Sequence, residues 1–111
     1  MKQYNLPLDN QQVKIINFGL GLLPDLQEAI PDTPNNRKLF SKSHLVPDLI
    51  MQLGTHQENQ FTKDQVNLIA LSILGLHLIA SGKIFIDQES KDFATNNFFK
   101  INHLHQFFAN I

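Results

Sequence analysis

Residues 61–82 read FTKDQVNLIALSILGLHLIASG and form the most apolar stretch of the chain. They open with a capping motif, because the hydroxyl of Thr62 can accept a hydrogen bond from the backbone of Gln65 while the Gln65 amide reaches back to Thr62. They close at Gly82, a residue type that readily takes the left-handed conformation found after helices. We therefore predict a helix over about 63–81.

The predicted helix is apolar on every side. The large apolar residues that leave no continuous polar face are Val66, Leu68, Ile69, Leu71, Ile73, Leu74, Leu76, Leu78 and Ile79. A helix with this distribution is buried among other helices. We therefore expect an all-α bundle of five or six helices packed around residues 63–81. We expect no membrane span, because the stretch is too short and too polar for one, which takes about 20 mostly apolar residues.

A similar capping motif precedes the helix expected near the N-terminus. Asp9 is followed three residues later by Gln12, so the two can exchange hydrogen bonds across the first helical turn. We expect this helix to break at Gly19 and Gly21, before Pro24, since each glycine destabilises a helix interior by about 1 kcal/mol relative to alanine. Proline and capping positions predict further helices over residues 24–30, 34–40, 48–53 and 95–110, with Thr33 and Thr95 as caps, and a polar loop over 55–60.

One alternative fold contains strands. Residues 83–87 read KIFID, which is the composition of a strand, and residues 12–18 are the other candidate strand. A single short strand needs a partner to be stable. If these two segments pair, the protein is an α+β fold with a short two-stranded element.

Length and composition fit a single globular helical domain over residues 1–111. Charged residues make up only 17% of the chain, so 11 Asn and 10 Gln supply much of its polar surface. Cysteine is absent, which removes disulfides and thiolate chemistry and fits a reducing compartment. The first residues also lack the pattern of a signal peptide. We therefore predict a cytoplasmic protein.

The ionisable residues form no recognisable catalytic or metal-binding pattern. His103 and His105 are two residues apart, which places them on different sides of a helix, whereas helical metal pairs are three or four residues apart. His77 lies within the central apolar helix, where a histidine that hydrogen-bonds a backbone carbonyl is more common than a functional one. We therefore expect no metal, no cofactor and no enzymatic activity.

Basic residues gather in one short segment. Between Thr33 and Pro47 the chain holds Arg37, Lys38 and Lys42 and no acidic residue, so these three are candidate phosphate contacts. The net charge of the chain is −1, however, whereas nucleic-acid binders usually carry a strongly basic domain. A solvated helix face is the simpler explanation, and a weak nucleic-acid-associated regulator is the alternative function.

The last predicted helix separates an apolar stripe from a polar face. The stripe, expected to be core, contains Phe98, Ile101, Leu104, Phe107, Phe108 and Ile111. The opposite face carries Phe99 among Asn102, His103 and Gln106. An aromatic side chain in polar surroundings is a candidate anchor for a partner. We therefore predict that these four residues bind a partner.

Together these features indicate a small non-enzymatic protein-binding module of the inhibitor, immunity, adaptor or assembly type. Such a module needs a stable fold and an apolar and amide-rich contact surface, and the chain supplies both. The expected partner is another protein or a second copy of this chain, in a homodimer.

Overall fold

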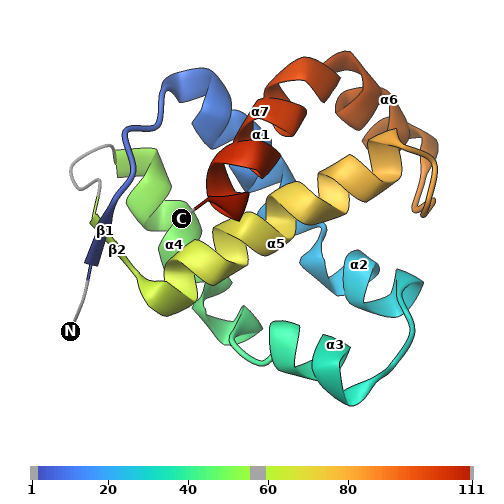
Figure 1. The fold of residues 1–111 in the computed structure, drawn as a ribbon, viewed down its shortest axis with the longest axis horizontal. Coiled ribbons are helices and arrows are strands. Elements are labelled where there is room, and N and C mark those ends of the chain that lie inside the picture. The colour runs from blue at the N-terminus through green and yellow to red at the C-terminus, as the bar shows by residue number, and fades with distance from the viewer. Residues whose placement is uncertain (1–2, 56–59, 111) are drawn as a thin grey trace.

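Helix α5 (Lys63–Ala80) runs through the centre of the molecule, and the other helices surround it (Figure 1). The structure is a computed structural model that describes residues 3–55 and 60–110. Helices α1 (Asn10–Gly21), α6 (Gln88–Asn96) and α7 (Phe98–Ala109) make the most extensive contacts with α5. The fully buried core residues at these contacts include Ile16, Ile69, Ile73, Ala94 and Ile101. The predicted all-α class, with residues 63–81 as the central helix, is confirmed.

The remaining helices lie between α1 and α5 in the sequence. Helices α2 (Leu23–Ala29) and α3 (Pro34–Leu39) also touch α5, and α4 (Val46–Thr55) packs against α1. A single 3-10 turn over Ser43–Leu45 joins α3 to α4. The polar loop expected over residues 55–60 lies mostly outside the described residues, since Thr55 ends α4 and Gln60 begins a strand.

A short antiparallel sheet joins two segments other than the ones expected. Strand β1 (Gln3–Asn5) pairs with β2 (Gln60–Thr62), and Tyr4 lies opposite Phe61. The alternative pairing of residues 12–18 with 83–87 was wrong, because the first segment lies within α1 and the second contains no strand. The capping motif at Asp9 commits residues 12–18 to a helix.

Both predicted capping motifs are confirmed. The Asp9 carboxylate accepts a hydrogen bond from the Gln12 backbone N–H at 2.8 Å, and the Gln12 side chain accepts one from the Asp9 N–H at 2.9 Å. Thr62 and Gln65 exchange the same pair of bonds at the start of α5. These bonds satisfy backbone donors that a helix start leaves unpaired. The start of α5 directly after β2 is therefore stabilised by residues within its own first turn.

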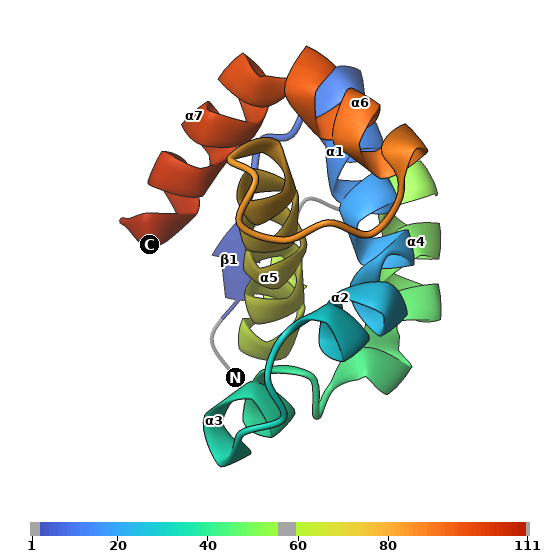
Figure 2. The same cartoon turned by 90° about the vertical axis from the view of Figure 1, so that its right-hand side faces the viewer.

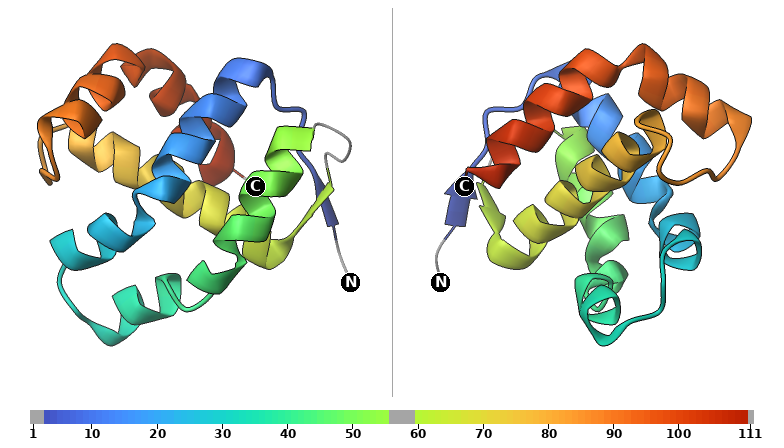
Figure 3. Two further views of the ribbon diagram at one scale, coloured as in Figure 1. Left: turned by 180° about the vertical axis from the view of Figure 1, so that it is seen from behind. Right: turned by 45° about the vertical axis from the view of Figure 1, so that its right-hand side comes forward.

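The helix break expected at Gly19 and Gly21, before Pro24, is confirmed at Leu22, although Gly19 itself lies inside α1. Helix α1 continues through Gly19 to Gly21, and α2 begins at Leu23. A Cβ atom at Gly19 would lie 2.8 Å from the backbone carbonyl oxygen of Ser72 on α5. The left panel of Figure 3 shows this crossing of α1 over α5. Glycine is present here because it lets two helices approach closely.

The C-terminal end of α5 is closed by two residues. Gly82 has a φ of 80°, which confirms the left-handed terminator expected from the sequence. The ammonium of Lys91 on α6 donates hydrogen bonds to the carbonyl oxygens of Ile79, at 3.0 Å, and Ala80, at 3.5 Å. A cation at this position also opposes the negative end of the helix dipole. Lys91 therefore ties α6 to the end of α5.

Residues 83–87 form no strand and lead directly into helix α6. The cap expected at Thr95 was also wrong, because the helix begins earlier. Asp87 caps α6 by accepting a hydrogen bond from the Ser90 backbone N–H at 2.7 Å. This bond to its charged form holds the pKa of Asp87 below its usual value. Thr95 lies inside α6, and α7 begins after Asn97.

Candidate functional site

One face of α5 is left uncovered between α3 and α7. Figure 2 looks nearly along α5, with α7 on one side of this face and α3 on the other. The uncovered face carries Asn67, which is exposed, and Ala70 and Leu74, which are half-buried. A helix this apolar is normally enclosed on all sides. The expectation that α5 is enclosed therefore holds on every side except this one.

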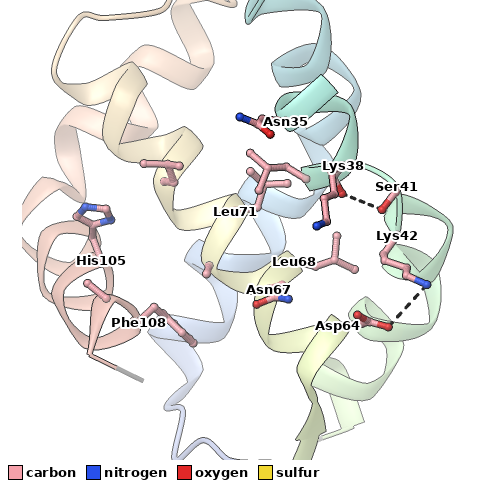
Figure 4. Close-up of a pocket in the computed structure, with 14 residues that line it drawn as sticks. Asn35, Lys38, Ser41, Lys42, Asp64, Asn67, Leu68, Leu71, His105 and Phe108 are labelled. Carbon is pink, nitrogen blue, oxygen red and sulfur yellow. Dashed lines mark hydrogen bonds and ion pairs between the residues drawn. The ribbon is translucent and has the colours of Figure 1, made fainter. Parts of the chain in front are cut away.

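The uncovered face is the floor of a groove with a volume of about 700 Å³, which we call the α5 groove (Figure 4). Its floor consists of Asp64, Asn67, Leu68, Ala70, Leu71 and Leu74. One wall comes from α3 and the turn that follows it, with Lys38, Leu39 and Lys42. The other wall comes from α7, with His105, Phe108 and Ala109. The groove thus has a mainly apolar floor, and its walls carry both polar and apolar side chains.

The three basic residues predicted as phosphate contacts, Arg37, Lys38 and Lys42, differ in their ion-pair partners. The Arg37 guanidinium lies 2.7 Å from the Asp32 carboxylate, and both groups are exposed outside the groove. The Lys42 ammonium lies 3.9 Å from the Asp64 carboxylate, and each side chain is about half exposed, so the pair adds little stability. Lys38 forms no ion pair with any residue in the described ranges. The candidate phosphate contacts are therefore divided: Lys38 and Lys42 line the groove, and Arg37 does not.

The predicted partner-binding residues form one solvent-facing side of α7. Phe99 is 85% exposed, His103 and Gln106 are exposed, and Asn102 is half-buried. None of these four lines the α5 groove, because the groove uses the adjacent side of the same helix. The structure therefore brings the predicted residues together, on a convex surface separate from the groove.

The apolar stripe of α7 is only partly core. Ile101 and Leu104 are buried, as expected. Phe98 is 42% exposed and Phe107 is 44% exposed, so the expectation that they are core residues was wrong. Ile111 lies outside the described residues.

His77 and His105 stack where α5 meets α7. Their ring centroids are 4.7 Å apart, and the Phe98 ring lies 6.1 Å from that of His77. The expectation of a core histidine bonded to a backbone carbonyl was wrong, since His77 is half-buried and packs against another ring. Partial burial lowers the pKa of His77, and the charges of His105 and Lys83 lower it further.

In the groove, the Ser41 hydroxyl donates a hydrogen bond to the Lys38 carbonyl at 2.8 Å and so is held by its own turn. Across residues 3–55 and 60–110, no three His, Asp or Glu side chains come close enough to share a metal ion. None of the helices in these two ranges is long and apolar enough to cross a membrane.

The groove residues Leu39, Leu71 and Leu74 were not recognised as a site from the sequence. Leu71 and Leu74 belong to the predicted core helix, and nothing local distinguishes their side of it. The one available signal was Asn67, a polar residue in the mainly apolar middle of the helix, four residues before Leu71 and on the same side.

Comparisons of the chain with protein families, with curated proteins and with solved structures find no match.

Proposed function

We propose that the protein is a small, non-enzymatic protein-binding module that takes an apolar segment of a partner into the α5 groove. The observation that supports this most directly is the uncovered face of α5, where the half-buried Ala70 and Leu74 line a groove. Covering such a face removes apolar surface from water, at about 25 cal/mol per Å². A cytoplasmic location, expected from the lack of cysteine, belongs to the same proposal.

The layout of the groove supports a protein interface. Leucine and alanine side chains form most of its floor, Asp64 and Asn67 lie at one end of that floor, and Lys38 lies on the α3 wall. Protein interfaces share this layout of an apolar centre with a polar rim.

The Phe99 face of α7 is the second candidate contact surface. It consists of Phe99, Asn102, His103 and Gln106 and is exposed enough to meet a partner or a second copy of the chain. The residues that dominate binding energy usually lie in well-packed, desolvated pockets. The concave α5 groove offers that environment, and the convex Phe99 face does not. We therefore assign the primary contact to the groove.

Site-specific photocrosslinking tests this assignment. A photoreactive phenylalanine analogue is placed at Leu74 in the groove, at Phe99 on α7, or at Met51, an exposed residue of α4 that does not line the groove. Each variant is irradiated in native lysate, with and without nuclease. We expect a discrete protein adduct from position 74, resistant to nuclease and lost when excess unmodified protein competes, and none from position 51.

Each other result contradicts part of the proposal. An adduct from position 99 alone would move the contact to α7. A nuclease-sensitive adduct would favour the nucleic-acid alternative that uses Arg37, Lys38 and Lys42. Absence of any adduct from positions 74 and 99 would contradict protein binding altogether.

A further inference from the structure

The charge of the α5 groove lies on one side. The α3 wall carries Lys38 and Lys42, and the α7 wall carries the stacked His105 and the apolar Phe108. Asp64 offsets Lys42 at one end, but Lys38 has no acidic partner in the part of the chain that the structure describes. Figure 4 shows the Lys38 ammonium on the side of α3 that faces α5. An occupant of the groove therefore meets an uncompensated positive charge along one edge only.

The shape of the groove selects a helix over an extended chain. Both long sides are helices, α3 and α7, whose interior backbone groups are already hydrogen-bonded within each helix. An extended peptide would find no strand edge to pair with, and its own buried backbone groups would stay unsatisfied. A helix satisfies its backbone internally and packs its side chains between those of the helix beneath it.

The floor also sets the length of the occupant. It runs from Asp64 to Leu74, with side chains at intervals of three and four residues along one side of α5. At 1.5 Å per residue this is roughly 15 Å, or about three helical turns. A helix of about 11 residues therefore covers the uncovered face.

We propose that the occupant of the α5 groove is an amphipathic helix of a partner protein, about three turns long, with Asp or Glu along the flank that faces Lys38. This inference rests on the proposed function and adds the conformation and charge of the bound segment. Its apolar stripe replaces the missing neighbour of Leu71 and Leu74, and its acidic flank compensates Lys38.

The helices of this chain do not supply that segment. The acidic helices α2 and α6 already bury their apolar residues, such as Leu26 and Ala94, inside the fold. The exposed aromatic side of α7 presents Phe99 beside Lys100 and His103, which repel Lys38 when charged. Helix α4, which carries Asp48, likewise buries its leucines Leu49 and Leu53. Of the large apolar side chains of α4, Met51 alone is strongly exposed. We therefore take the partner to be a different protein.

A displayed library of helices tests the proposal. Each member is a helix of about 14 residues with a fixed leucine stripe and random residues on both flanks. The library is sorted at low salt against three purified proteins: the wild type, Lys38→Glu in the groove, and Lys100→Glu on the exposed side of α7. Circular dichroism confirms that all three are folded.

We expect the wild type and Lys100→Glu to enrich acidic residues on one flank and Lys38→Glu to enrich basic residues on the same flank. An enriched acidic helix should bind Lys38→Glu roughly two- to five-fold more weakly than wild type, the range for one exposed ion pair, and salt should reduce the difference. Leu74→Glu should abolish binding of every enriched helix.

The opposite outcomes separate this inference from the proposed function. Enriched helices without a flank preference, or with one that Lys38→Glu leaves unchanged, would overturn the predicted charge. Failure to enrich any helix, while position 74 still crosslinks to a native protein, would overturn the helical occupant and leave the binding module intact. Binding of dodecanoate that depends on Lys38 and Leu74, with no helix enriched, would replace the helix with a lipid-like ligand.

Discussion

Substitution of Gly19 by alanine probes the crossing of α1 and α5, on which the position of the groove floor depends. The added Cβ atom would lie 2.8 Å from the carbonyl oxygen of Ser72 and 2.9 Å from its Cβ. Because the nearest atom is backbone, the two helices must move apart. Overpacking of this kind costs about 1–3 kcal/mol. Alanine recovers up to about 1 kcal/mol of helix propensity, so Gly19→Ala should lower the free energy of unfolding by about 1–2 kcal/mol.

Gly21 provides a matched control two residues away in the same helix. A Cβ atom at Gly21 would meet no atom within 4 Å. Gly21→Ala should therefore gain the propensity term without the clash and raise the free energy of unfolding by about 0.5–1 kcal/mol. The two alanine variants should differ by roughly 2 kcal/mol. Urea denaturation followed by circular dichroism measures both. Equal stability of Gly19→Ala and Gly21→Ala would refute the close crossing.

Three further predictions concern other parts of the structure. Lys91→Met should lower the free energy of unfolding by about 1 kcal/mol in urea titrations, because the carbonyl groups at the end of α5 lose their charged donor; an unchanged midpoint would contradict this role. Because the folded state lowers the pKa of His77, the unfolded chain binds a proton more readily, so stability should fall as the pH drops below about 6.5 and level off above it. His77→Phe should weaken this pH dependence, and an unaltered profile would assign it to other groups. Phe98→Ala should lower the free energy of unfolding by well under the roughly 3–5 kcal/mol that truncation of a buried phenylalanine costs, because Phe98 is 42% exposed. Phe99→Ser should lower it by about 0.5 kcal/mol or less. A larger loss at Phe99 would show that this residue is part of the core.

Structural features that depend only on residues close together in the chain were predictable from the sequence. The bonds between Asp9 and Gln12, and between Thr62 and Gln65, span three residues each and formed as expected. The end of α5 at Gly82 was predictable because glycine is the residue type that takes a positive φ without strain. The central position of α5 followed from its apolar residues alone.

Features that depend on distant residues were not predictable. The close packing at Gly19 was not predicted, because its partner, Ser72, lies more than fifty residues away in the chain. The apolar residues before Asp87 have the composition of a strand, so the role of Asp87 as the cap of α6 was not predicted. The partners of Arg37 and Lys42 are Asp32 and Asp64, both outside the basic segment.

The candidate site was the hardest part to predict. A sequence shows that α5 is apolar all round, but it does not show which neighbours are present, so the face of Ala70 and Leu74 was assigned to the core. The Phe99 face was predicted correctly as exposed, because the spacing of polar residues along α7 marks the side that faces water. The spacing of polar residues shows which side of a helix faces water, but it does not show where an apolar helix lacks a neighbouring helix.

The pairing of β1 with β2 also constrains the order of folding. Gln3 lies opposite Thr62, so this pairing closes a loop of roughly 60 residues that contains α1 to α4, at an entropic cost of about 3–4 kcal/mol. Two strands of three residues cannot offset that cost on their own. The ladder therefore forms only after α1 has docked on α5 and brought the two segments together. Its amide hydrogens should exchange with solvent long before those of α5, and the first opening of the native protein should begin at this edge.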